Sequence, residues 1–148
     1  TWTPPFSHSV KINVDAGITR STNSTALAAV VKNFRGEVTG WTKLNKSGTL
    51  DSYTAELYAI SLGLTLASSL KYTTIICEGD NKDVITTCSV VIAGKKESML
   101  PIHNLILKQA LSFNSISFKF IPREANECAH ELTKGSLSID QNLFIPPG

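Results

Sequence analysis

Apolar and polar residues alternate in the first part of the chain. Residues 10–15 place apolar side chains at every second position and end on Asp15. This alternation predicts a strand with one packed face that ends on a carboxylate. Residues 26–32 and 37–43 form two further apolar stretches, and the four residues between them end in a glycine. We therefore expect these two strands to be joined by a tight hairpin.

The hydrophobic period then changes from two residues to between three and four. Apolar residues at this spacing predict a helix over residues 53–67. The later segments predict strands over 71–77 and 115–121, and helices over 80–91, 99–113 and 122–134. In the last strand we expect Ile116, Phe118 and Phe120 to face inward, and Pro122 to open the last helix.

The resulting order of elements is β-β-β-α-β-α-α-β-α. It predicts an α/β domain with a five-stranded mixed sheet, whose first three strands are antiparallel and which is flanked by helices. A doubly wound nucleotide-binding fold would begin β-α-β and carry a glycine-rich first turn, and this chain has neither. Proline pairs near both ends predict a linker over residues 1–9, one domain over 10–137 and a C-terminal tail over 138–148.

Composition narrows the class of protein. With 42% hydrophobic residues and a net charge of only +2, the chain does not have the composition of a disordered protein. No apolar run approaches the roughly 20 residues of a membrane helix. Three cysteines cannot form a complete disulfide framework, which favours an intracellular, reducing compartment such as the nucleus, the cytoplasm or an organelle. The small net charge argues against a strongly basic nucleic-acid-binding protein.

Three acidic residues lie near the predicted ends of elements. Each has an ordinary explanation, which is a turn for Asp15, the helix dipole for Glu56 and an N-cap for Asp80. If the first and fourth strands are neighbours, however, the three carboxylates converge at one end of the sheet, where their mutual repulsion calls for a cation. Such a cluster suits Mg²⁺ or Mn²⁺, and a pair of these ions suits hydrolysis of a phosphodiester.

Four short motifs carry a resemblance to a known family. They are Lys-Ile-Asn-Val-Asp at 11–15, Thr-Ala-Glu-Leu at 54–57, Cys-Glu-Gly-Asp at 77–80, and Ile-Pro-Arg-Glu-Ala-Asn at 121–126 followed by Ala-His-Glu-Leu at 129–132. In order and spacing they resemble the plant ribonuclease H-like domains, which are similar to the RNase H modules of non-LTR reverse transcriptases. The match runs from Trp2 almost to the C-terminus. It implies the RNase H fold, in a monomeric domain that cleaves the RNA strand of RNA–DNA hybrids with divalent metal ions.

The resemblance also implies roles for the acidic residues. Asp15 would bridge two metal ions, while Glu56 and Asp80 would complete the site of one. Active relatives usually carry a further Asp on the last helix, and here His130 takes that position. Imidazole is a poor ligand for Mg²⁺ but an acceptable one for Mn²⁺. Three outcomes are open: slow hydrolysis with His130 as a ligand or proton shuttle, a preference for Mn²⁺, or a catalytically silent module that binds nucleic acid or protein. Without the resemblance, His130 would be read as a surface histidine.

Substrate contacts follow from the same resemblance. The residues that would contact the hybrid are Gly17, Ser52, Lys82, Arg123 and Asn126. Gly17 would let the backbone approach the substrate, and Arg123 either meets a phosphate or pairs with a neighbouring acid. Lys95 and Lys96 lie where some RNase H enzymes place a basic handle, although two lysines also fit a solvated loop. The hybrid would be recognised by its shape and its 2′-hydroxyls.

Overall fold

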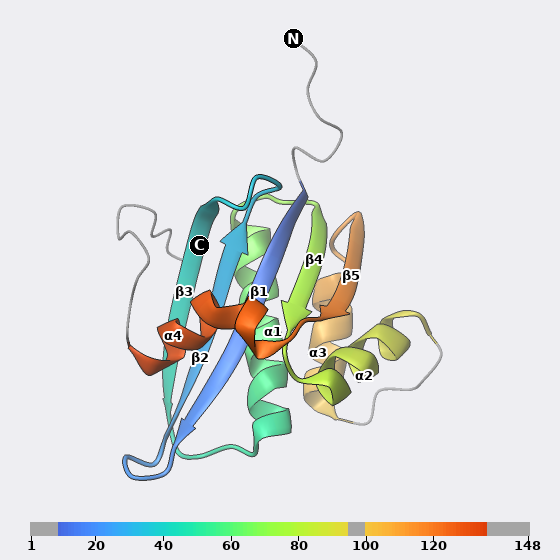
Figure 1. Cartoon of the computed structure of the whole chain (residues 1–148). Coiled ribbons are helices and arrows are strands. Elements are labelled where there is room, and N and C mark those ends of the chain that lie inside the picture. Colours follow the sequence, from blue (N-terminus) through green and yellow to red (C-terminus); the bar gives the residue numbers. More distant parts are fainter. Residues whose placement is uncertain (1–8, 95–99, 136–148) are drawn as a thin grey trace.

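The computed structural model describes residues 9–94 and 100–135 of the chain (Figure 1). The strands are β1 (Ser9–Thr19), β2 (Ser24–Lys32), β3 (Val38–Ser47), β4 (Thr74–Gly79) and β5 (Ser115–Phe120). The helices are α1 (Ser52–Ser69), α2 (Lys82–Ile92), α3 (Pro101–Ala110) and α4 (Glu127–Lys134), with a 3₁₀ turn η1 (Arg123–Asn126) before α4. The predicted tail, the predicted linker apart from Ser9, the first residue of the predicted helix 99–113, and Lys95 and Lys96 lie outside the described residues.

Five strands form one mixed sheet in the order β3-β2-β1-β4-β5. The first three strands pair antiparallel, whereas β4 is parallel to both β1 and β5. This arrangement confirms the predicted fold class, and it makes β1 and β4 neighbours. The predicted last helix is divided into η1 and α4, with Pro122 before the 3₁₀ turn. Among the described residues, no helix is long and apolar enough to cross a membrane.

Helices cover both faces of the sheet. In Figure 1, α4 lies in front of the sheet, and α1 and α3 lie behind it. Behind the sheet, α1 packs on β1 and β2 in the main hydrophobic core, which contains Ile12, Leu57 and Leu64. In front, Ala129 and Leu132 of α4 pack on β2. Since α4 also contacts β1, the polar side of that strand is buried too, so the prediction that β1 has a single packed face is wrong.

Two predictions for the parallel strands are also wrong. The fourth strand begins at Thr74 rather than Lys71, because Lys71 has a φ of 68°, which a β-strand cannot accommodate. Phe120 is 44% exposed rather than inward-facing, because it is the last residue of an edge strand. Ile116 and Phe118 do pack against the core, as predicted.

Gly63 allows α1 to approach the sheet closely. A β-carbon at this position would lie 2.8 Å from Cγ2 of Ile12 and 2.9 Å from Cγ1 of Val14. Both of these side chains are fully packed in the core, so they have little room to move. The absence of a side chain at Gly63 therefore fixes the distance between α1 and β1, the two elements that carry Glu56 and Asp15.

We predict that Gly63→Val lowers the free energy of unfolding by about 3 kcal/mol, because the new side chain overpacks the interface between α1 and β1. The matched control is Ser68→Val, which places the same side chain on the exposed side of α1 and should change stability by less than about 0.5 kcal/mol. Urea unfolding followed by circular dichroism measures both values. Equal stability of the two variants would show that Gly63 does not set the helix–sheet distance.

Candidate active site

The structure contradicts the ordinary explanation of each of the three acids, which was a turn, the helix dipole or an N-cap. Asp15 does not end a strand, because β1 continues to Thr19 in its antiparallel pairing with β2. Glu56 is the fifth residue of α1 and therefore lies beyond the first turn, where the helix dipole would favour it. Asn81, not Asp80, is the N-cap of α2, and its side chain accepts a hydrogen bond from the first turn of that helix. None of the three carboxylates is placed by local helix or turn chemistry.

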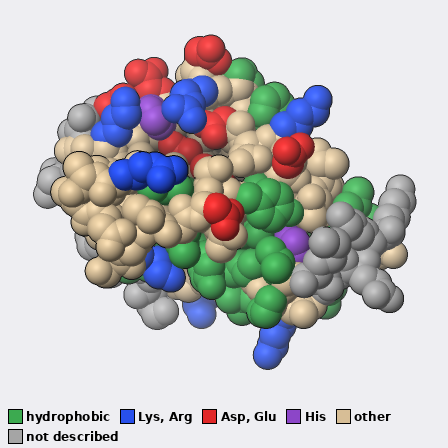
Figure 2. Space-filling model, turned by 90° about the horizontal axis from the view of Figure 1, so that it is seen from below, with side chains coloured by type: hydrophobic (Ala, Val, Ile, Leu, Met, Phe, Trp, Pro, Cys, Tyr) green, Lys and Arg blue, Asp and Glu red, His purple; other side chains and the backbone are tan. Residues whose placement is uncertain are grey.

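The fold instead brings these carboxylates together. Asp15, Glu56 and Asp80 each contribute an oxygen atom to a group in which all three atoms lie within 4.8 Å of one another. Asp15 is 1% exposed and Glu56 is 7% exposed, while Asp80 is partly buried. Seen from below, acidic side chains, a histidine and several Lys and Arg side chains gather in one area of the surface (Figure 2). The convergence expected from the neighbouring strands is therefore present.

Burial and mutual repulsion make the group electrostatically unfavourable. Burial, followed by the charges of Asp15 and Asp80, raises the pKa of Glu56 to about 9. Burial and the charge of Asp15 also raise the pKa of Asp80, although Asn126 and Arg123 oppose this shift. Without a cation, Glu56 thus keeps its proton at neutral pH. Three clustered oxygen donors fit a hard divalent ion such as Mg²⁺ or Mn²⁺, which would compensate their charge.

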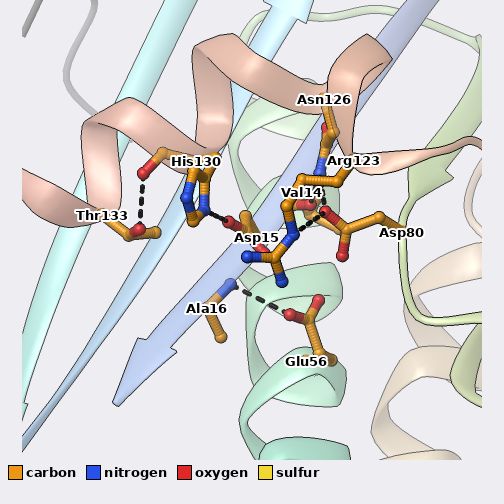
Figure 3. A network of polar contacts seen from close by, with 9 residues as sticks. All are labelled: Val14, Asp15, Ala16, Glu56, Asp80, Arg123, Asn126, His130 and Thr133. Atoms are coloured by element: carbon orange, nitrogen blue, oxygen red, sulfur yellow. Dashed lines mark hydrogen bonds and ion pairs between the residues drawn. The ribbon is translucent and has the colours of Figure 1, made fainter. Parts of the chain in front are cut away.

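Backbone and amide groups hold two of the carboxylates (Figure 3). The backbone N–H of Ala16 donates to Oε1 of Glu56 over 3.2 Å. Nδ2 of Asn126 donates to the carbonyl oxygen of Val14 over 2.8 Å and to Oδ2 of Asp80 over 3.4 Å. Asn126 is only 1% exposed and lies beneath the site, so its contact with the substrate stays a prediction. Its position ties the segment before α4 to β1 and Asp80.

His130 faces the site from α4. Its Nδ1 lies 2.9 Å from Oδ2 of Asp15, and its side chain is only 19% exposed, so it is not a surface histidine. An ionised carboxylate can only accept hydrogen bonds, so Nδ1 donates to Asp15 when Asp15 is charged. The hydroxyl of Thr133 donates to the carbonyl oxygen of His130 over 2.6 Å. His130 therefore orients Asp15 from the last helix of the fold.

The other predicted contact residues border two hollows at the site. Ser52 and Lys82 line a hollow of about 360 Å³ together with Glu56 and Asp80. Gly17 lines a second hollow of about 490 Å³, next to His130. Arg123 borders both hollows. Its Nε lies 3.9 Å from Oδ2 of Asp80, so it does pair with an acid, while 67% of its side chain remains exposed.

Sequence reasoning missed two contributors to this site. The backbone N–H of Ala16 orients Glu56, and a backbone donor leaves no trace in the pattern of side chains. The carbonyl oxygen of Val14 anchors Asn126 across 112 residues of sequence. This second contact can be expected only from the fold, which places β1 next to the segment before α4.

Comparison with known proteins places the chain in a family. A family model described as reverse transcriptase-like matches residues 13–136, which is most of the chain. No curated protein sequence matches the chain.

Solved structures of RNases H share the fold. RNase H1 from the halophilic archaeon Halobacterium salinarum NRC-1 superposes with a TM-score of 0.72 at 18% identity, covering 86% of this chain and 98% of the other. The N-terminal RNase H domain of Rv2228c from Mycobacterium tuberculosis, solved as a fusion with maltose-binding protein, gives 0.67 at 21% identity, with coverages of 86% and 97%. LC11-RNase H1 in complex with an RNA/DNA hybrid gives 0.71 at 17% identity, with coverages of 85% and 94%. The chain thus belongs to the reverse transcriptase-like family and has the RNase H fold.

Proposed function

We propose that this domain hydrolyses the RNA strand of RNA–DNA hybrids in a reaction that depends on a divalent metal ion. The observation that carries the proposal is the group of three carboxylate oxygens within 4.8 Å, supplied by Asp15, Glu56 and Asp80. The family match and the shared fold support this reaction class. One structural relative was solved with an RNA/DNA hybrid, which supports the substrate class.

The surrounding groups suit a phosphodiester substrate. A divalent cation held by the three carboxylates would supply a Lewis acid that assists attack of water on phosphorus and departure of the 3′-oxygen. Ala16 and His130 keep Glu56 and Asp15 oriented, so these carboxylates need little rearrangement. Arg123 and Lys82 border the hollow with positive charge, where they would meet phosphate oxygens. The products would be a 3′-hydroxyl and a 5′-phosphate.

The donor set also bears on the choice of metal and on the rate. Oxygen donors suit both Mg²⁺ and Mn²⁺, and Mn²⁺ in addition tolerates imidazole. His130 is already engaged with Asp15, so a second ion at that position would lack the carboxylate that relatives supply. We therefore expect slow hydrolysis, which is faster with Mn²⁺ than with Mg²⁺. The same histidine favours the second candidate, a module that binds the hybrid without cleaving it.

The compartment and the assembly state belong to the same proposal. We propose a monomeric domain working in the nucleus, the cytoplasm or an organelle. The support for a reducing compartment is that Cys77, Cys88 and Cys128 are all free thiols.

We predict that the wild-type protein cleaves a blunt RNA–DNA hybrid in Mn²⁺, and that Asp15→Asn lowers the rate by about 1000-fold because the site loses charge that holds the cation. The matched control is Glu127→Gln, which neutralises an exposed acid outside the carboxylate group and should keep the rate within about twofold. Gel analysis of labelled RNA measures both rates. Retained binding of the hybrid without any product in either metal would establish the silent module instead.

Substitution of His130 separates its two proposed effects. We predict that His130→Asp raises the rate in Mg²⁺ by about tenfold or more, because it restores a hard oxygen donor. His130→Ala should lower the rate in Mn²⁺ by about 10- to 100-fold, because Asp15 loses its orienting partner. The separate values of kcat and KM in each metal check both effects. Equal rates for wild type, His130→Asp and His130→Ala would exclude His130 from the site.

A further inference from the structure

The face of the sheet that carries α4 is only partly covered. The helix packs over Ala28 and Val30 of β2, at one end of this face. Beyond it, the register places polar residues side by side across four strands. The paired residues are Lys32 with Lys11, Asn13 with Glu78, and Glu78 with Lys119. They lie on the same side of the sheet as Asp15, because side chains alternate along β1.

These residues line a third hollow, which we call the basic pocket. Its volume is about 550 Å³, and its charged lining residues are Lys11, Lys32, Arg35, Glu78 and Lys119. Four cations and one carboxylate leave three positive charges around it. The pocket does not share a lining residue with the two hollows at the carboxylate group, so it is a separate feature of the surface.

The single carboxylate in the basic pocket is turned toward the protein. The side chain of Glu78 is 8% exposed, accepts a hydrogen bond from Nδ2 of Asn13 over 3.2 Å, and lies 3.8 Å from Nζ of Lys11. Lys11 itself is 51% exposed in its side chain, so its ammonium group still faces the pocket and solvent. Glu78 therefore steadies the floor and neutralises at most one of the four cations.

An aromatic ring stands beside these charges. Phe34, in the hairpin between β2 and β3, lines the pocket and is 45% exposed. The guanidinium of Arg35 lies 5.5 Å from the centre of its ring. A cationic groove with an accessible aromatic ring is the combination that binds single-stranded nucleic acid, since cations contact the phosphates and a base stacks on the ring.

The extent of the charges favours a polymer over a small anion. Lys32 on β2 and Lys119 on β5 are separated by three strand spacings, or about 14 Å. One phosphate group cannot reach both, whereas a strand with several phosphates can. An acidic peptide would satisfy the lysines, but it carries no base that could stack on the exposed part of the Phe34 ring.

We propose that the basic pocket binds a single strand of nucleic acid, in particular a strand that continues beyond the hybrid in the active site. The segment between β5 and α4 borders both places, with Ile121 and Ala125 at the basic pocket and Arg123 at the carboxylate group. The claim that this strand continues from a hybrid in the active site rests on the proposed function. The claim that the basic pocket binds a single strand is independent of it.

Fluorescence anisotropy with a labelled oligothymidylate of about 15 nucleotides, in EDTA, tests this proposal without any cleavage. Binding should weaken with salt, with a slope of log affinity against log salt of about −0.7 for each phosphate neutralised. Lys11→Gln/Lys119→Gln should lower the affinity about tenfold and flatten this slope by about 1.4. Phe34→Ala should lower the affinity about tenfold with little change in the slope.

The matched control is Lys71→Gln/Lys108→Gln, which removes the same charge beside α1 and α3, on the other side of the sheet. It should bind the oligothymidylate as the wild type does. Absence of binding by the wild type, an equal loss in the control, or equally strong competition by polyglutamate would overturn the proposal.

Cleavage of the blunt hybrid, measured in parallel, separates the proposed binding of a single strand from the proposed function. Cleavage without oligothymidylate binding contradicts the basic pocket, whereas binding without cleavage supports it and contradicts only the proposed function.

Discussion

Repulsion among three clustered carboxylates, two of them buried, is the constraint on which the rest of the site depends. Asp15, Glu56 and Asp80 are brought within 4.8 Å by the pairing of β1 with β4 and by the close packing of α1 on β1. In the metal-free protein a proton on Glu56 reduces this repulsion, because the pKa of Glu56 rises to about 9. The folded protein then binds more protons than the unfolded chain between the ordinary pKa of 4.5 and about 9, so its stability falls as the pH rises through that range. A divalent cation bound by the three carboxylates would replace the proton and remove this penalty, which would couple metal binding to the folded state.

The groups around the carboxylates hold them in this arrangement. Asn126 ties the segment before α4 to β1 and to Asp80, and that segment leads into the helix that carries His130. Through His130, the front layer of the fold then fixes Asp15. The helix behind the sheet supplies Glu56, whose carboxylate is held by the backbone of β1. The two layers thus meet at the carboxylates. The segment before α4 also borders both this site and the basic pocket.

The sequence predicted the elements well and their limits less well. Hydrophobic periodicity identified the five strands, the long helix and their order, because one-sided burial leaves a regular pattern. It placed Asp15 at a strand end, because the continuation of β1 depends on pairing with β2 and not on apolar alternation. Glu56 was predicted to lie in a first turn, because the helix begins at Ser52, within a polar stretch that carries no apolar pattern. The buried roles of Asn126 and Ala16 depend on contacts between distant segments, which a single sequence does not contain. The sequence did not reveal the basic pocket for a related reason, since its cations come from three separate segments of a chain whose net charge is only +2.

The most direct test of this account is a carbon-13 NMR titration of the glutamate side-chain carboxyl groups in the metal-free protein, with the Glu56 signal assigned by its loss in Glu56→Gln. The account predicts a Glu56 pKa near 9, so that the carboxyl is protonated at pH 7 and ionises when Mg²⁺ or Mn²⁺ is added at that pH. Since Mn²⁺ is paramagnetic, Mg²⁺ gives the cleaner spectrum. A Glu56 carboxyl that titrates near its ordinary pKa of 4.5, and whose signal does not respond to Mg²⁺, would contradict the claim that the three carboxylates form one charge-coupled metal site.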